Sequence, residues 1–80
     1  MNSLQRPAYQ KIIDYLRQRR LASELTQADL ASLLGKPQSY ISKTEAYERR
    51  LDILEYVTIA KALKLDPAKA LKAGITKSKA

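Results

Sequence analysis

Polar side chains suited to hydrogen bonding recur at helical spacing between residues 38 and 45. Positions three or four apart share one side of a helix, and that side carries Gln38, Ser39, Ser42 and Lys43. A glutamine amide can donate and accept in one bidentate contact to adenine, a lysine can reach the O6 and N7 acceptors of guanine, and a serine suits several bases. The spacing indicates a surface able to read base edges, although an ordinary solvated helix face has the same composition.

The composition lacks the residues that thiol chemistry and most metal sites require. The 80 residues include neither Cys nor His, which excludes disulfides, thiol chemistry, typical zinc sites and the usual proton shuttle at neutral pH. No acid and base are paired in a pattern that suggests a catalytic pocket. We therefore expect no enzymatic activity, no metal and no cofactor.

The charge balance favours a polyanionic partner. The 15 Lys and Arg residues outnumber the 8 Asp and Glu residues, for a net charge of +7; this suits nucleic acid, although solubility alone can explain such a charge. A membrane partner is disfavoured, because the apolar helix faces are needed to cover one another. Charged residues interrupt the first part of the chain, so we expect no signal peptide, no spanning helix and a cytoplasmic location.

Two short helices joined by a three-residue turn must position the polar face. Thr26 can cap the first helix, with Asp29 as its reciprocal partner, and Gly35 stands where a left-handed cap would end it. Pro37 then forces a turn before the second helix starts at Gln38. This order of signals is the layout of a helix-turn-helix.

Three further helices are expected around this pair, over residues 7–21, 53–64 and 67–73, because start signals and apolar residues at helical spacing occur there. No strand pattern is present. The predicted fold class is therefore all-α, a compact five-helix bundle. Its predicted core consists of Leu16, Leu25, Leu30, Ala31, Leu34, Ile41, Leu54, Ala60 and Leu63.

The length fits a single domain with a modest core. We expect the domain to span residues 1–75, with Gly74 ending the last helix as a C-terminal cap. Residues 76–80 contain lysines among small residues and are expected to form a basic, flexible tail.

An ordered set of short motifs runs through residues 9–71. In chain order they are Leu25-Thr26-Gln27, Leu30-Ala31, Leu34-Gly35, Gln38-Ser39-Tyr40-Ile41-Ser42-Lys43, and Glu45 followed by Glu48-Arg49-Arg50-Leu51-Asp52. In these motifs and their spacing the chain resembles the lambda-repressor and Cro-like helix-turn-helix family, also called the xenobiotic-response-element (XRE) family. It departs from the family at Glu24 and Tyr47, where members often have Gly in a left-handed turn. A non-glycine residue held in that conformation is strained by about 1 to 2 kcal/mol.

The resemblance implies a lambda-repressor-like bundle whose helix from Gln38 lies in the major groove of double-stranded DNA. Gln38, Ser39 and Lys43 would then face base edges, and Ser42 would touch a base or a phosphate. Gln27 would meet a phosphate and hydrogen-bond Gln38. Phosphate contacts are also expected from Tyr40, Arg49, Arg50 and Arg17.

Some of these cations have alternative explanations. Arg49 and Arg50 could simply be solvated, and Arg17 could serve the helix dipole instead of a phosphate. Arg20 and Glu45 align with a family ion pair that joins the first helix to the end of the reading helix. We interpret that pair as structural.

The resemblance and the charge together imply a sequence-specific transcription regulator, with repression favoured. A homodimer is expected, because two-fold pairing doubles the base contacts of a small module. The candidate dimer surface is Leu65, Leu71 and Ile75, although Leu65 and Leu71 could equally close the core. The alternative is a protein-binding adaptor with the same fold, such as an antitoxin, whose binding would depend weakly on salt.

Overall fold

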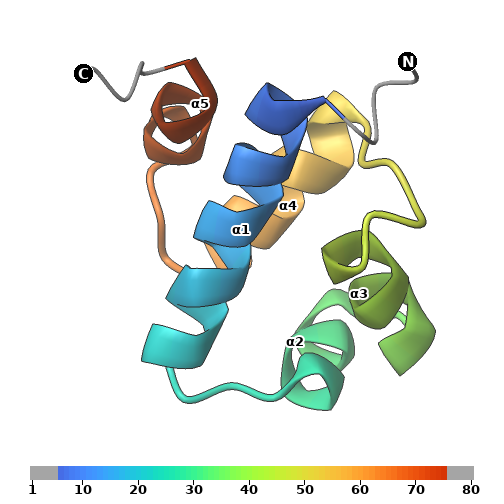
Figure 1. Ribbon diagram of the computed structural model, residues 1–80. Coiled ribbons are helices and arrows are strands. Elements are labelled where there is room, and N and C mark those ends of the chain that lie inside the picture. The colour runs from blue at the N-terminus through green and yellow to red at the C-terminus, as the bar shows by residue number, and fades with distance from the viewer. Residues whose placement is uncertain (1–5, 76–80) are drawn as a thin grey trace.

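Five helices make up the fold in the computed structural model, which describes residues 6–75 (Figure 1). They are α1 (Pro7–Ala22), α2 (Gln27–Leu34), α3 (Gln38–Glu45), α4 (Ile53–Ala62) and α5 (Pro67–Ile75). The all-α, five-helix prediction is confirmed. Figure 1 shows α5 on one side of α1 and the α2–α3 pair on the other. Within the described residues, no helix has both the length and the hydrophobicity needed to cross a membrane.

Reciprocal capping boxes start two of the helices. At α2, the Asp29 N–H donates to Thr26 Oγ1 and the Thr26 N–H donates to Asp29 Oδ2, both at 2.9 Å. At α4, the Glu55 N–H donates to Asp52 Oδ1 at 2.8 Å, and the Asp52 N–H donates to Glu55 Oε1 at 3.0 Å. Each box satisfies backbone donors that a helix start otherwise leaves unpaired. Gly35 ends α2 with φ +68°, the left-handed cap expected there.

Three non-glycine residues also have left-handed backbone: Glu24, Tyr47 and Lys64, with φ between +57° and +62°. The loops after α1 and α3 therefore keep the turn for which glycine is the usual residue. The strain is offset by neighbouring bonds: the Leu25 N–H donates to the Arg20 carbonyl at 3.2 Å. The Tyr47 hydroxyl donates to the Asp14 carboxylate on α1. A side-chain anchor thus holds the second strained turn in place.

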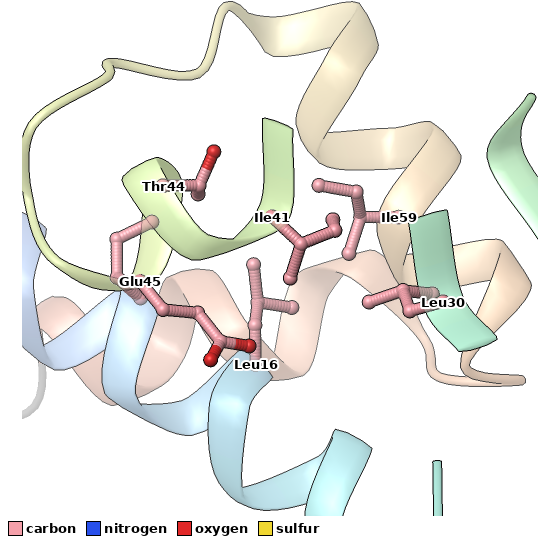
Figure 2. A pocket seen from close by; sticks show the side chains of 7 residues that line it. Leu16, Leu30, Ile41, Thr44, Glu45 and Ile59 are labelled. Atoms are coloured by element: carbon pink, nitrogen blue, oxygen red, sulfur yellow. The ribbon is translucent and has the colours of Figure 1, made fainter. Parts of the chain in front are cut away.

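All five helices contribute to the hydrophobic core, whose centre lies where α1, α2, α3 and α4 meet. Figure 2 shows Ile41 pointing from α3 into the space between Leu16, Leu30 and Ile59. Of the predicted core residues, Leu25 and Leu34 pack against its edge and are only partly buried. The buried apolar residues are Ile13, Leu16, Leu30, Ala31, Ile41, Tyr56, Ile59, Ala60, Leu63, Leu65 and Ala70.

The prediction of Leu54 as a core residue is wrong, because its side chain is 74% exposed. The buried face of α4 instead runs through Tyr56, Ile59, Ala60 and Leu63, which follow the i, i+3, i+4, i+7 pattern of a helix packed on one side. Leu54 falls outside that stripe. Because α4 contains many apolar residues, the sequence alone does not show which of two overlapping apolar stripes faces the core.

Gly74 does not end α5, which is a second correction. The helix continues to Ile75, and Gly74 is buried inside it. A Cβ at this position would lie 2.6 Å from Ile12 Cγ1 and 2.7 Å from the Ala8 carbonyl oxygen. Gly74 therefore permits the close approach of α5 to α1.

Replacing Gly74 with Ala tests this packing role. In an exposed helix interior the change would stabilise the fold by up to about 1 kcal/mol. Here we expect a loss of about 1 to 3 kcal/mol in the free energy of unfolding, because backbone and Ile12 must shift. Urea unfolding at neutral pH measures the difference. A stabilised variant would show that the approach of α1 and α5 is not tight.

Candidate nucleic-acid interface

The outward face of α3 is exposed while its inward face is locked into the core. Ile41 is 1% exposed and Thr44 is 4% exposed, and the Thr44 hydroxyl donates to the Tyr40 carbonyl at 2.6 Å. The side chains predicted to read bases lie on the other side: Gln38, Ser39 and Lys43 are exposed, and Ser42 is half-buried. The structure therefore places all four predicted base-reading residues at the surface of one well-anchored helix.

A buried ion pair ties the end of α3 to α1. Arg20, only 5% exposed, donates from Nε to Glu45 Oε2 at 2.7 Å and from Nη2 to Glu45 Oε1 at 2.9 Å. Arg20 Nη1 also donates to the Leu25 carbonyl at 2.7 Å, which ties the loop before α2 to the same ion pair. Figure 2 shows the Glu45 carboxylate reaching from α3 toward α1. Removing one partner would strand a buried charge, at a cost of about 3 to 5 kcal/mol.

Hydrogen bonds extend this pair to the first residue of α3. Gln27 Nε2 donates to Glu45 Oε1 at 2.9 Å, and Gln38 Nε2 donates to Gln27 Oε1 at 3.4 Å. The bond between Gln27 and Gln38 is thus present, as the resemblance implies. Arg17 lies beside the same carboxylate, with its Nε 3.8 Å from Glu45 Oε1 and its side chain half exposed. We call the series Arg20, Glu45, Gln27 and Gln38 the amide relay.

A second cluster lies on the flank of α3, around Tyr40. The Arg49 guanidinium stacks 4.2 Å from the centre of the Tyr40 ring and Lys36 Nζ lies 5.3 Å from it. Arg49 also donates to both carboxylate oxygens of Glu55, at 3.2 Å and 2.6 Å. Partial burial, and then the Glu55 charge, raises the pKa of Tyr40. Its hydroxyl therefore stays protonated and can donate to an anion.

Arg49 is therefore already paired, which the sequence did not suggest. Its phosphate contact remains a prediction, and it would compete with Glu55 for the guanidinium. The spacing of Asp52 and Glu55 signals a capping box, but nothing in that spacing indicates the second role of Glu55. Lys36 was missed because it belongs to the turn before α3.

Side chains of α1 hydrogen-bond the loop between α3 and α4. The Leu51 N–H donates to the Tyr9 hydroxyl at 3.2 Å, and that hydroxyl donates to the Arg49 carbonyl at 3.5 Å. Together with the bond from Tyr47 to Asp14, these contacts fix the loop at two points. Residues more than thirty positions apart make them, so local sequence patterns could not reveal them.

The candidate dimer residues divide into two groups. Leu65 is 8% exposed and belongs to the core, which is the alternative that the sequence left open for it. It offers no dimer surface, because after α4 the chain turns inward at this residue. Leu71 and Ile75 of α5 are exposed, as are Ile53 and Leu54 at the start of α4. Ile53 and Leu71 line a groove of about 170 Å³ between α1, α4 and α5.

The Arg49–Glu55 pair predicts a pH dependence of stability. Hydrogen bonds from Arg49, and then from the Asp52 backbone, lower the pKa of Glu55 from its ordinary value of 4.5. A lowered folded-state pKa stabilises the fold above the unfolded value and loses that effect as the pH falls. Glu55→Gln should therefore lower the melting temperature at neutral pH and flatten its decline between about pH 5 and pH 3.

Glu48→Gln is the matched control, because Glu48 is an exposed carboxylate in the loop that carries Arg49. It should leave the melting curve nearly unchanged at neutral pH. If Glu55→Gln and the parent chain lost stability in parallel below about pH 5, the pair would not contribute to the acid sensitivity.

Comparison with known proteins agrees with this geometry. A helix-turn-helix family model matches residues 16–69, more than half of the chain. A solved structure, described as an XRE-family like protein from Pseudomonas syringae pv. tomato str. DC3000, is 42% identical, with a TM-score of 0.78 over 84% of this chain and 82% of that one. No curated protein matches. The chain belongs to the Cro/C1-type, XRE helix-turn-helix family of DNA-binding domains.

Proposed function

We propose that this chain is a sequence-specific transcription regulator that reads an operator with α3 in the major groove. The observation that carries the proposal is the exposed polar face of α3, held by the buried Arg20–Glu45 pair. A helix of this size fits the major groove of B-DNA. The net charge of +7 favours association with a polyanion in the cytoplasm. The chain acts without catalysis.

Base choice falls to the side chains on that face. Gln38 can pair with adenine through one donor and one acceptor, and Lys43 can donate to guanine O6 and N7. Ser39 is short enough to accept several neighbours, and Ser42, whose hydroxyl lies 3.4 Å from the Ser39 carbonyl, borders the face. These four residues supply few contacts, so one domain alone has modest specificity.

Phosphate contacts flank the reading helix on both sides. Gln27 is the first residue of α2, where backbone N–H groups and the helix dipole favour an anion. On the other flank, Lys36 and Arg49 lie beside the ring of Tyr40, whose protonated hydroxyl can donate to a phosphate, and Arg50 follows next in the chain. Such contacts set register and affinity rather than sequence choice.

We also propose that the regulator is a homodimer and acts as a repressor. Ile53 and Leu71 expose apolar surface along the groove between α1, α4 and α5, and Leu54 and Ile75 are exposed on the same two helices, α4 and α5. Exposed apolar patches of this kind mark protein interaction sites. The α5 side of this surface lies across α1 from α2 and α3 (Figure 1), so a partner there leaves the reading face open.

Substitution of the base-reading side chains tests the proposal. Gln38→Ala or Lys43→Ala should each cost about 1 to 3 kcal/mol on the operator found by selection from a random duplex pool. On a scrambled duplex the loss should be small. Fluorescence anisotropy at physiological salt measures both. Lys69→Ala, which removes an exposed charge from α5, is the matched control, and it should affect the two duplexes alike.

The salt dependence of binding separates this proposal from the adaptor alternative. For DNA binding, log affinity falls against log salt with a slope of about 0.9 per phosphate neutralised. A protein-binding adaptor would show little loss of partner affinity over the same range. A flat salt profile and equal affinity for all duplexes would contradict the proposal.

A further inference from the structure

The Glu45 carboxylate determines whether the nitrogen or the oxygen of the Gln27 side-chain amide faces it. A carboxylate only accepts hydrogen bonds and a guanidinium only donates them. Both Glu45 oxygens already face Arg20 donors, and Oε1 faces Gln27 as well, at 2.9 Å. Gln27 must therefore turn its Nε2 toward Glu45, because its carbonyl oxygen would meet another acceptor there. With both Glu45 oxygens acting only as acceptors, the flipped orientation of the Gln27 amide would place two oxygens against each other.

This orientation is passed on to Gln38. With its nitrogen facing Glu45, Gln27 presents Oε1 to α3, and the Gln38 amide donates to it from Nε2 at 3.4 Å. Gln38 then has its own Oε1 and one remaining N–H to offer outward. One acceptor beside one donor matches the N6 donor and N7 acceptor of adenine. Guanine, with two acceptors at O6 and N7, would leave the Gln38 oxygen facing another acceptor.

We propose that Glu45 is a positioning residue for base choice: it fixes the polarity of the amide relay, so that Gln38 favours adenine over guanine. The inference rests on the proposed function, in which α3 enters the major groove. It gives the Arg20–Glu45 pair a role beyond joining α1 to α3. The pair acts through Gln27 and touches no base itself.

The relay can be reversed by one substitution. In Glu45→Gln the single remaining oxygen stays with Arg20 Nε, and the new NH₂ group takes the place of Oε1, where it faces Gln27 and gives up the bond from Arg20 Nη2. Gln27 can then turn its oxygen toward that group and its nitrogen toward Gln38. Gln38 would accept from Gln27 and point both of its N–H groups outward, toward two acceptors such as guanine O6 and N7.

Paired duplexes that differ only at the base pair read by Gln38 test the inference. Gln38→Ala identifies that position as the one where preference disappears. Anisotropy titrations then give the ratio of adenine to guanine affinity, expected at roughly 5- to 150-fold for the parent chain. Glu45→Gln should bring the ratio to about 1 or below. Gln27→Leu, which cuts the relay and leaves the ion pair intact, should bring it toward 1.

Fold and specificity controls accompany these variants. Circular dichroism and thermal melts check each fold; if Glu45→Gln does not fold, Gln27→Leu decides the matter. Gln18→Leu alters an exposed glutamine of α1 and should keep the parent ratio. In all folded variants the preference at the position read by Lys43 should be unchanged.

The outcomes are distinguishable. A folded Gln27→Leu or Glu45→Gln chain with the parent ratio would overturn the positioning role and leave the proposed function standing. A parent preference for guanine at this position would overturn it too. A parent chain with no preference among duplexes would overturn the proposed function, and this inference with it.

Discussion

The buried contact between Arg20 and Glu45 is the constraint on which the rest of the site depends. It joins the last turn of α1 to the last residue of α3 and, through the Leu25 carbonyl, to the loop before α2. Burying two charges is costly, and a well-packed apolar pair is often as stable. A guanidinium and a carboxylate form two hydrogen bonds in only a few relative orientations, so this pair restricts how α3 can lie against α1.

The flank of α3 beyond Tyr40 has a support of its own, built from different chemistry. Tyr9 and Asp14 of α1 hold the loop after α3 by hydroxyl bonds, and the Arg49–Glu55 pair closes it against α4. The strained turn at Tyr47 persists because these bonds hold it. The C-terminal end of α3 and the loop that follows it are therefore both anchored to α1, whereas the first residue of α3, Gln38, is bonded to Gln27 of α2. This rigidity means that little ordering entropy has to be lost when α3 meets a partner.

Much of this arrangement follows from the sequence, because caps, turns and helical periodicity are local. The start of α2 at Thr26, its end at Gly35 and the bounds of α3 were predicted where the structure has them. Leu54 was misplaced because two apolar stripes overlap on α4, and only packing decides between them. Gly74 was read as a helix end because local rules do not include the neighbouring α1.

The candidate site also has parts that the sequence predicts and parts that it does not. The exposed face of α3 is visible in residue types and spacing, whereas the Arg49–Glu55 pair and the loop anchors on α1 depend on where helices meet. The direction of the amide relay is harder still to predict from the sequence. It emerges only when each donor and acceptor between Arg20 and Gln38 is counted in three dimensions.

The central claim is that α3 is already set in place and that its outer face meets DNA. The most direct measurement is amide chemical-shift mapping of the free chain and its complex with a duplex selected from a random pool. We expect large shifts at Gln27 and across residues 38–43, with nuclear Overhauser contacts between α1 and α3 unchanged. Shifts centred on the groove between α1, α4 and α5, or a rearranged α1–α3 contact, would contradict the account.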